Sequence, residues 1–322
     1  MCTAINIDGN FFARTLDYER SFGEQIIITP RERVTYGKAQ NRYATIGIGV
    51  VKDGSPLYFD GMNEWGLAVA ALNFPGYAAY QSPSEGKAAV SADRLAGLIL
   101  GFCRNIDEVK SALDNIAVTE DEGGAKLHWL ISDRRGSITV EPVEGGLRVY
   151  DNPVGVLTNS PDLPFHLTRL ADYAQLHPQD PENRLARTNI TPYSRGMGAI
   201  GLPGDFSSSS RFVRGVFVKE NTRVAEKSPA ETSKAEGSAS EITRIFHIAD
   251  AVSVPCGCVV TEEGRPVSTI YTVVFDLENL NLCFTTYNCR RIRAVKLTDA
   301  LMTAKDLQSY PLYRPEEIEK LN

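Results

Sequence analysis

The chain has 322 residues, of which 43% are apolar and 23% are charged, as is typical of a globular protein and not of a disordered or fibrous one. A net charge of −6, from 34 basic and 40 acidic residues with no long basic run, argues against binding to nucleic acid. No apolar stretch approaches the about 20 residues of a membrane-spanning helix, and no secretory signal opens the chain. We therefore expect a cytoplasmic protein that contacts no membrane and keeps its cysteines as thiols.

Strand patterns dominate the first half of the chain. Asp8-Gly9 stands between the apolar runs 5–7 and 11–16, and this pair tolerates the positive φ angles of a tight turn, so the segment predicts a hairpin. Cys2 therefore lies at the head of a strand. Further strands are predicted at 25–28, 44–51, 57–59, 66–72, 127–131, 137–143 and 147–150.

Helical patterns stand between these blocks of strands. Apolar residues at helical spacing predict helices at 91–103, 106–113, 164–176 and 241–251. The polar segment 226–240 predicts a flexible surface loop and not a domain boundary. Strands return at 268–275, 282–286 and 291–297. Because helices do not alternate with single strands, the pattern predicts an α+β fold with antiparallel sheets.

Metal and nucleotide chemistry find little support in the sequence. None of the four histidines has a metal-binding spacing, and His128, beside Trp129 in an apolar strand, is typical of a buried core histidine. No glycine-rich nucleotide-binding motif follows a strand. The last four cysteines lack the spacing of a zinc knuckle: Cys256, Cys258, Cys283 and Cys289.

Cys2 offers a nucleophile and a base on one residue. Methionine aminopeptidases remove Met1 when the next side chain is small, which leaves Cys2 with a thiol and a free α-amine. The usual pKa values of these groups are about 8.5 and about 7.7–8.0, and an N-terminal amine can serve as the base for its own side chain. On the predicted hairpin, Arg14 could stabilise the thiolate and Asp17 could hold the ammonium. The same two residues would also fit an exposed ion pair, and a cysteine at position 2 is weak evidence by itself.

Five motifs, taken together, make the chain resemble a known family. They are MCT (1–3), FARTLD (12–17), NEWGL (63–67) with LNFPGY (72–77), LTNSP (157–161), and GLPGDFS (201–207) with RF (211–212). In this order they resemble the choloylglycine hydrolases, which comprise bile salt hydrolases and penicillin V acylases and use an N-terminal nucleophile. The resemblance covers essentially the whole chain.

The resemblance implies a fold and a set of site residues. The implied fold is a four-layer αββα sandwich, with two antiparallel sheets between helical layers. It implies one domain, residues 1–322, and no cofactor. Similar proteins form homotetramers. Cys2 would be the nucleophile, Arg14 would lie against its thiol, and Asp17 would hold the α-amine. Asn73 and Asn159 would form the oxyanion hole, and Arg211 would complete the polar network, with Ser207–Ser210 as the loop that positions it. Asn73 and Asn159 also fit ordinary turn positions.

The expected reaction is hydrolysis of glycine- or taurine-conjugated bile acids through a thioester on Cys2, with transfer of the acyl group to another amine as a side reaction. Leu16, Phe74 and Tyr77 are expected to contact the steroid. The alternatives are a penicillin V acylase, which the asparagine at position 73 disfavours, an inactive relative that binds amphiphiles, and a thiol redox protein using Cys256 and Cys258. The preference between glycine and taurine stays open.

Overall fold

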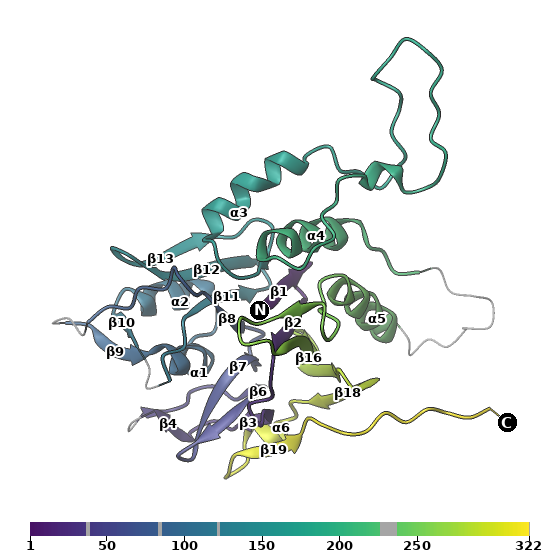
Figure 1. The fold of residues 1–322 in the computed structure, drawn as a ribbon. Helices are drawn as coiled ribbons and strands as arrows, with labels where there is room; N and C mark the ends of the chain where they lie inside the picture. The colour runs from purple at the N-terminus through teal and green to yellow at the C-terminus, as the bar shows by residue number, and fades with distance from the viewer. Residues whose placement is uncertain (37–38, 83–85, 121–122, 226–236, 322) are drawn as a thin grey trace.

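Two antiparallel sheets form the centre of the computed structural model, which describes residues 1–36, 39–82, 86–120, 123–225 and 237–321 (Figure 1). The first sheet has the strand order β14-β1-β2-β16-β17-β18, and β15 pairs with β16. These strands are β14 (Val156–Leu157), β1 (Cys2–Ile7), β2 (Phe11–Tyr18), β16 (Pro266–Asp276), β17 (Asn281–Thr286), β18 (Cys289–Lys296) and β15 (Val259–Val260).

The second sheet has the strand order β13-β12-β11-β8-β7-β6-β3-β19. Its strands are β13 (Gly146–Asp151), β12 (Gly136–Val143), β11 (Leu127–Asp133), β8 (Ala68–Asn73), β7 (Ser55–Asn63), β6 (Thr45–Lys52), β3 (Gln25–Thr29) and β19 (Gln308–Pro311). Two short pairs lie beside it: β4 (Val34–Tyr36) with β5 (Ala39–Gln40), and β9 (Ala88–Ser91) with β10 (Ile116–Thr119).

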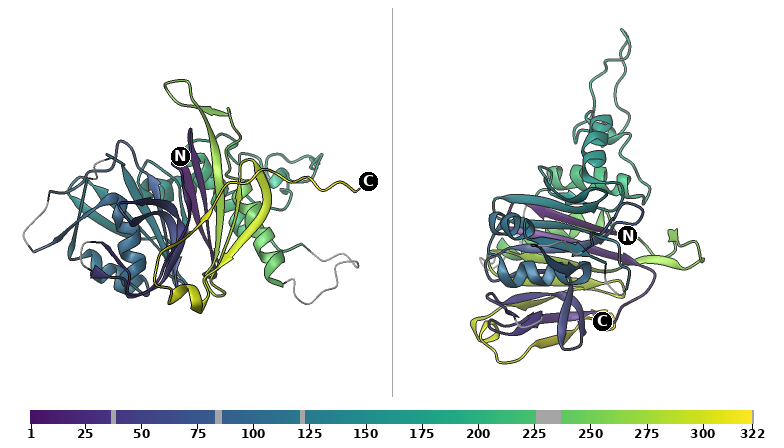
Figure 2. Two further views of the ribbon diagram at one scale, coloured as in Figure 1. Left: turned by 90° about the horizontal axis from the view of Figure 1, so that it is seen from below. Right: turned by 90° about the vertical axis from the view of Figure 1, so that its left-hand side faces the viewer.

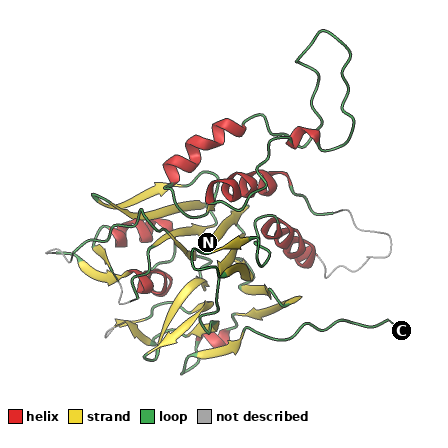
Figure 3. Ribbon diagram, viewed as in Figure 1, coloured by secondary structure: helices red, strands yellow, loops and turns green. Residues whose placement is uncertain are grey.

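Helices cover the outer face of each sheet (Figures 2 and 3). α1 (Ala92–Phe102) and α2 (Ile106–Leu113) share a core with the second sheet, and α4 (Ser208–Asn221) and α5 (Gly237–Asp250) share one with the first. A third core, which includes Cys2 and Leu16, fills the space between the sheets. The remaining helices are α3 (Leu163–Arg169), which continues as a 3₁₀ turn (Leu170–Tyr173), a second 3₁₀ turn (Met197–Ala199) and α6 (Asp299–Met302). The α+β prediction with antiparallel sheets is confirmed.

The predicted N-terminal hairpin is present and places Cys2 between the sheets. Asp8 and Gly9 have φ angles of 54° and 69°, as the tight turn requires. Cys2 pairs with Leu16, and Ala4 pairs with Arg14, across the two strands. Because alternate residues of a strand face the same side, this register brings Cys2, Arg14 and Leu16 to the face that packs against the second sheet.

Two predicted loops are helical where the structure describes them. Ser207–Ser210, expected as a loop, are the N-cap and first turn of α4: the Ser207 hydroxyl accepts a hydrogen bond from the Ser210 N–H at 3.4 Å. Serine competes with the backbone inside a helix but caps its start, which is why the run opens a helix instead of preventing one. Of the predicted loop 226–240, residues 237–240 belong to α5, and 226–236 lie outside the described residues.

An extended arm projects from the body between α3 and α4 (Figures 1 and 2). It carries Leu185 and Tyr193 with 91% and 87% of their surface exposed. In the described part of the chain, no helix has the length and apolar character needed to cross a membrane.

Candidate active site

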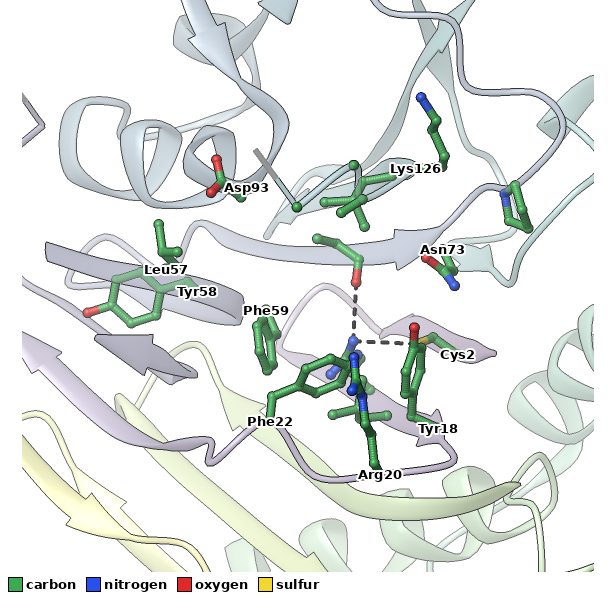
Figure 4. A pocket seen from close by; sticks show the side chains of 18 of the residues that line it. Cys2, Tyr18, Arg20, Phe22, Leu57, Tyr58, Phe59, Asn73, Asp93 and Lys126 are labelled. Carbon is green, nitrogen blue, oxygen red and sulfur yellow. Dashed lines mark hydrogen bonds between the residues drawn. The ribbon is translucent and has the colours of Figure 1, made fainter. Parts of the chain in front are cut away.

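The Cys2 side chain lies at the wall of a cavity of about 610 Å³ (Figure 4). Only 3% of the residue is exposed, because it stands at the head of β1 between the two sheets. The cavity wall next to it includes Arg14 and Leu16 from β2 and Ala71 and Asn73 from β8. Both sheets therefore contribute to the surroundings of the thiol.

The Arg14 guanidinium contacts the thiol directly. Its Nη2 lies 3.4 Å from Cys2 Sγ and donates to the Ala71 carbonyl at 3.2 Å, as the dashed lines in Figure 4 mark. On its other side, Nη1 donates to Asp60 Oδ2 at 2.9 Å and also contacts the Tyr271 hydroxyl. The guanidinium therefore joins Cys2 on the first sheet to Asp60 and Ala71 on the second.

Asp60 and Tyr271 anchor this guanidinium from behind, and both are fully buried. Tyr271 Oη donates to Asp60 Oδ2 at 2.5 Å. Burial raises the pKa of Asp60 to about 6, against the opposing effect of Arg14. Sequence reasoning missed both residues, because each is one polar position in an otherwise ordinary strand and only the packing of the sheets brings them together.

Arg211, Asn159 and the Cys2 backbone form a second buried cluster. The Cys2 N–H donates to Asn159 Oδ1 at 2.9 Å, and Arg211 Nη2 donates to the same oxygen at 2.6 Å. Arg211 Nη1 donates to the Cys2 carbonyl at 2.6 Å and to Thr3 Oγ1 at 2.7 Å. Arg211 extends from the second turn of α4, so this helix fixes its position.

Asn73 and Asn159 are joined to each other. Asn159 Nδ2 donates to the Asn73 carbonyl at 2.7 Å, and the Asn73 side chain lines the cavity close to Cys2 (Figure 4). His166 supports this pair, because its Nε2 lies 2.9 Å from the Asn159 carbonyl. Burial lowers the pKa of His166. The ring stacks on Phe212, which links α3 to α4 behind Asn159.

In the chain that still carries Met1, the Asp17 carboxylate lies beside Arg211. The Asp17 carboxylate accepts hydrogen bonds from Thr15 Oγ1 at 3.2 Å and Thr269 Oγ1 at 2.6 Å, and it stands 3.9 Å from Arg211 Nη1. The Met1 ammonium donates instead to the Asp17 backbone carbonyl at 2.6 Å. The Cys2 nitrogen is a peptide N–H in this chain, so any role as a base requires removal of Met1.

The three residues expected to contact the substrate lie in different surroundings. Leu16 lines the cavity, but Phe74 and Tyr77 do not. Phe74 is fully buried and stacks on His128, with ring centroids 4.2 Å apart, and Tyr77 is exposed on the outer surface. The aromatic and aliphatic wall is provided by other side chains: Tyr18, Phe22, Leu57 and Phe59.

The remaining sequence candidates lie away from the cavity. His128 is buried against Glu141 and the Thr158 carbonyl, as expected of a core histidine. Cys256 and Cys258 are exposed thiols in a turn before β15. Among the described residues, no group of three or more potential metal ligands comes together.

Comparisons with known proteins identify the family of the chain. The family model of linear amide C–N hydrolases, choloylglycine hydrolase family, matches residues 2–310. The chain is 37% identical to a bile salt hydrolase/transferase of Lactiplantibacillus plantarum over 97% of both chains. It is 33% identical to a bile salt hydrolase/transferase of Clostridium perfringens over the full length of both.

Solved structures extend the likeness to the fold. A conjugated bile acid hydrolase from Clostridium perfringens superposes with a TM-score of 0.86 at 31% identity, covering all of both chains. A penicillin V acylase from Agrobacterium tumefaciens gives a TM-score of 0.74 at 21% identity over 97% of this chain and 91% of the other, which shows a common fold. With an N-terminal-nucleophile fold, a cysteine at position 2 and a family match over almost its whole length, the chain belongs to the choloylglycine hydrolase family of linear amide C–N hydrolases.

Proposed function

We propose that this protein hydrolyses the amide bond of glycine- or taurine-conjugated bile acids, with Cys2 as the nucleophile. The observation that carries the proposal is the Cys2 thiol on the wall of a cavity with an aromatic and aliphatic side, with the Arg14 guanidinium 3.4 Å from its sulfur. A cavity of about 610 Å³ lies within the range of about 300–1,000 Å³ that drug-sized ligands occupy, and a steroid falls in that class. The names of the bile salt hydrolases that it resembles support the same substrate.

The first half of the mechanism forms a thioester. Once Met1 is removed, the Cys2 α-amine takes the proton of the thiol, and the sulfur attacks the amide carbonyl carbon. The carbonyl oxygen becomes an oxyanion, which Asn73, held through its backbone by Asn159, stabilises as a hydrogen-bond donor. The α-ammonium then gives its proton to the departing nitrogen, the carbon–nitrogen bond breaks, and glycine or taurine leaves.

The second half releases the bile acid. Water attacks the thioester carbonyl as the amine accepts one of its protons, and the carbon–sulfur bond breaks to return the thiol. An amine in place of water would give a new amide by the same steps, so acyl transfer belongs to the proposal. Asp17, already buried next to Arg211, is the carboxylate that would hold the freed α-ammonium.

The test is mass spectrometry on the purified protein incubated with glycocholate and, separately, with penicillin V. We expect loss of the Met1 mass and release of cholate faster than phenoxyacetate. Cys2→Ser should abolish turnover while keeping bile salt binding. A protein that retains Met1 and is active would contradict the mechanism, and preference for penicillin V would keep the chemistry but change the substrate. Binding without turnover by the processed wild type would support the inactive amphiphile-binding alternative.

The thiol redox alternative has its own test. Cys256 and Cys258 are both exposed, so reversible loss of two hydrogens from this pair would be visible by mass spectrometry. Turnover of bile salts by a Cys256→Ser, Cys258→Ser double variant at the wild-type rate would separate these thiols from the amidase reaction.

We also propose that the protein is a cytoplasmic homotetramer. The projecting arm supports an oligomer, because Leu185 and Tyr193 on it are almost fully exposed and would be buried by another subunit. The described cysteines are all free thiols, which suits a reducing compartment.

A further inference from the structure

The cationic side chains that line the cavity in the described part of the chain differ in whether they have an interaction partner. Among the described residues, the cations that line the cavity are Arg14, Arg20, Lys52 and Lys126. Arg14 pairs with Asp60 at 2.9 Å, Lys126 pairs with Glu120 at 2.6 Å, and Lys52 also has an interaction partner. Arg20 forms no ion pair with any described residue, so its charge remains for a ligand.

Arg20 is held against the aromatic wall of the cavity. Its guanidinium carbon lies 5.7 Å from the centroid of the Phe22 ring, and that ring contacts Tyr18 at 4.8 Å and Phe59 at 5.5 Å between centroids. An arginine stacked on a ring keeps the N–H groups along its edge available for an acceptor. The adjacent acid does not neutralise it, because Glu19 pairs with Arg265 at 3.3 Å.

Arg20 lies in the part of the cavity that contains Cys2. Figure 4 shows Arg20 between the Phe22 and Tyr18 rings on the side of the cavity near Cys2, whereas Asp93 stands at the far end. Asp93 Oδ1 accepts a hydrogen bond from Ser91 Oγ at 2.6 Å, which holds this carboxylate at the start of α1. An anionic group on a substrate is therefore favoured beside Arg20, in the part of the cavity near Cys2.

We propose that Arg20 binds the carboxylate or sulfonate of the amino acid on the leaving side of the scissile amide. The inference rests on the proposed function, since conjugated bile acids carry this anion one or two methylene groups beyond the amide nitrogen. With the carbonyl carbon at Cys2, the anion would lie in the part of the cavity where Figure 4 shows Arg20. A guanidinium binds a planar carboxylate or a tetrahedral sulfonate through paired N–H groups, and the aromatic wall beside it takes the apolar part of the same molecule.

The experiment compares two anionic substrates with a neutral one. Glycocholate, taurocholate and the uncharged primary amide of glycocholate are assayed with the wild type, Arg20→Met and Arg20→Lys. Arg104→Met is the matched control, because Arg104 also lies over an aromatic ring, Trp65 at 5.8 Å, but does not line the cavity. The rates with anionic substrates are also measured at low and high salt.

We expect Arg20→Met to lower kcat/KM about tenfold for both anionic conjugates, mainly through KM, and to leave the neutral amide within about twofold. Arg20→Lys should retain part of the preference for anions, and Arg104→Met should behave as the wild type. Added salt should slow the wild type more than Arg20→Met on the anionic substrates. These results would support the assignment.

Equal loss on all three substrates, or no loss on any, would overturn the role of Arg20 while leaving the proposed function intact. A wild type that has lost Met1 and cleaves none of the three would overturn both proposals. The neutral amide thus separates recognition of the anion from a general effect of the substitution on folding.

Discussion

At the scale of single residues, the buried contact between Arg14 and Asp60 connects the candidate nucleophile to the interior of the protein. Arg14 reaches Cys2 Sγ with one nitrogen and Asp60 with the other, so the carboxylate fixes the guanidinium that faces the thiol. Removing one partner of a buried ion pair leaves an uncompensated charge and typically costs about 3–5 kcal/mol. Asp60→Asn should therefore destabilise the fold and reduce activity together.

The titration of Asp60 gives this prediction a pH dependence. Burial raises the pKa of Asp60 from its ordinary value of 3.8 to about 6, so between these values the folded chain holds a proton that the unfolded chain has released. Stability contributed by this group is present below about pH 4 and is lost as pH rises through about 6. The difference in free energy of unfolding between wild type and Asp60→Asn should therefore narrow as pH rises from 4 to 6. Urea denaturation of both proteins across this range would measure it, and a constant difference would contradict it.

Leu16 is the expected substrate contact that the structure does place on the cavity. It lies opposite Cys2 in the hairpin and 4% of it is exposed. We predict that Leu16→Ala raises KM for glycocholate about tenfold, because a buried leucine contact contributes about 1.5–3 kcal/mol. Leu297→Ala, at a core position away from the cavity, should lower stability similarly and leave KM unchanged. An equal KM for the two variants would show that Leu16 does not contact the substrate.

At the scale of elements, α4 links a capping interaction to the candidate site. Ser207 caps the helix, and Arg211, from its second turn, reaches the Cys2 carbonyl and Asn159. The Asp205 carboxylate reinforces this end: hydrogen bonds from Ser207 and Ser210 lower its pKa to about 2. The start of the helix is therefore part of the support of the site.

We predict that Ser207→Ala costs about 1 kcal/mol of stability and also lowers kcat, because fraying of the first turn would loosen Arg211. Asn105→Ala serves as the control. The Asn105 side chain caps α2 by accepting a hydrogen bond from the Glu108 N–H at 3.0 Å, and the substitution removes this cap. It should cost a similar amount of stability without affecting kcat. Thermal melts and initial rates of both variants would measure the two effects. An unchanged kcat in Ser207→Ala would argue against a link between the helix cap and the position of Arg211.

At the scale of the whole molecule, distant parts of the chain share both sheets. β2 pairs with β16 and β3 pairs with β19, so the N-terminal and C-terminal regions complete the same layers. We propose on this basis that 1–322 folds as one domain. Far-ultraviolet and near-ultraviolet circular dichroism should then report the same urea midpoint, whereas two separated transitions would indicate independent domains.

The projecting arm belongs to the same scale, because its Leu185 and Tyr193 side chains are almost fully exposed. We predict that the double variant Leu185→Glu, Tyr193→Glu has a lower molar mass by light scattering than the wild-type oligomer. Leu321→Glu, which changes an equally exposed leucine near the C-terminus, should leave the mass unchanged. An unaltered mass in the arm variant would show that the arm does not hold the subunits together.

Features that depend on near neighbours along the chain could be predicted from the sequence. The Asp8-Gly9 turn, the period of the strands and the helices α1 and α2 follow from local conformational preferences, and these agreed with the structure. The five motifs also identified the family and the candidate residues from Cys2 to Arg211. A serine run was harder to interpret, because Ser207–Ser210 can form either a loop or a helix start until the contacts of Asp205 and Arg211 are known.

Only the tertiary structure decided which side chains meet in space. Phe74 and Tyr77 look like pocket residues in sequence. In the structure Phe74 packs on His128 and is buried, and Tyr77 is exposed and does not line the cavity. No sequence motif marks Asp60, Tyr271 or Arg20 as a site residue. Asp60 and Tyr271 gain their role where β7 and β16 meet β2, and Arg20 gains its role from the charges around it in the cavity. Electrostatic and packing energies depend on distances between residues that are far apart in the chain, and folding alone sets those distances.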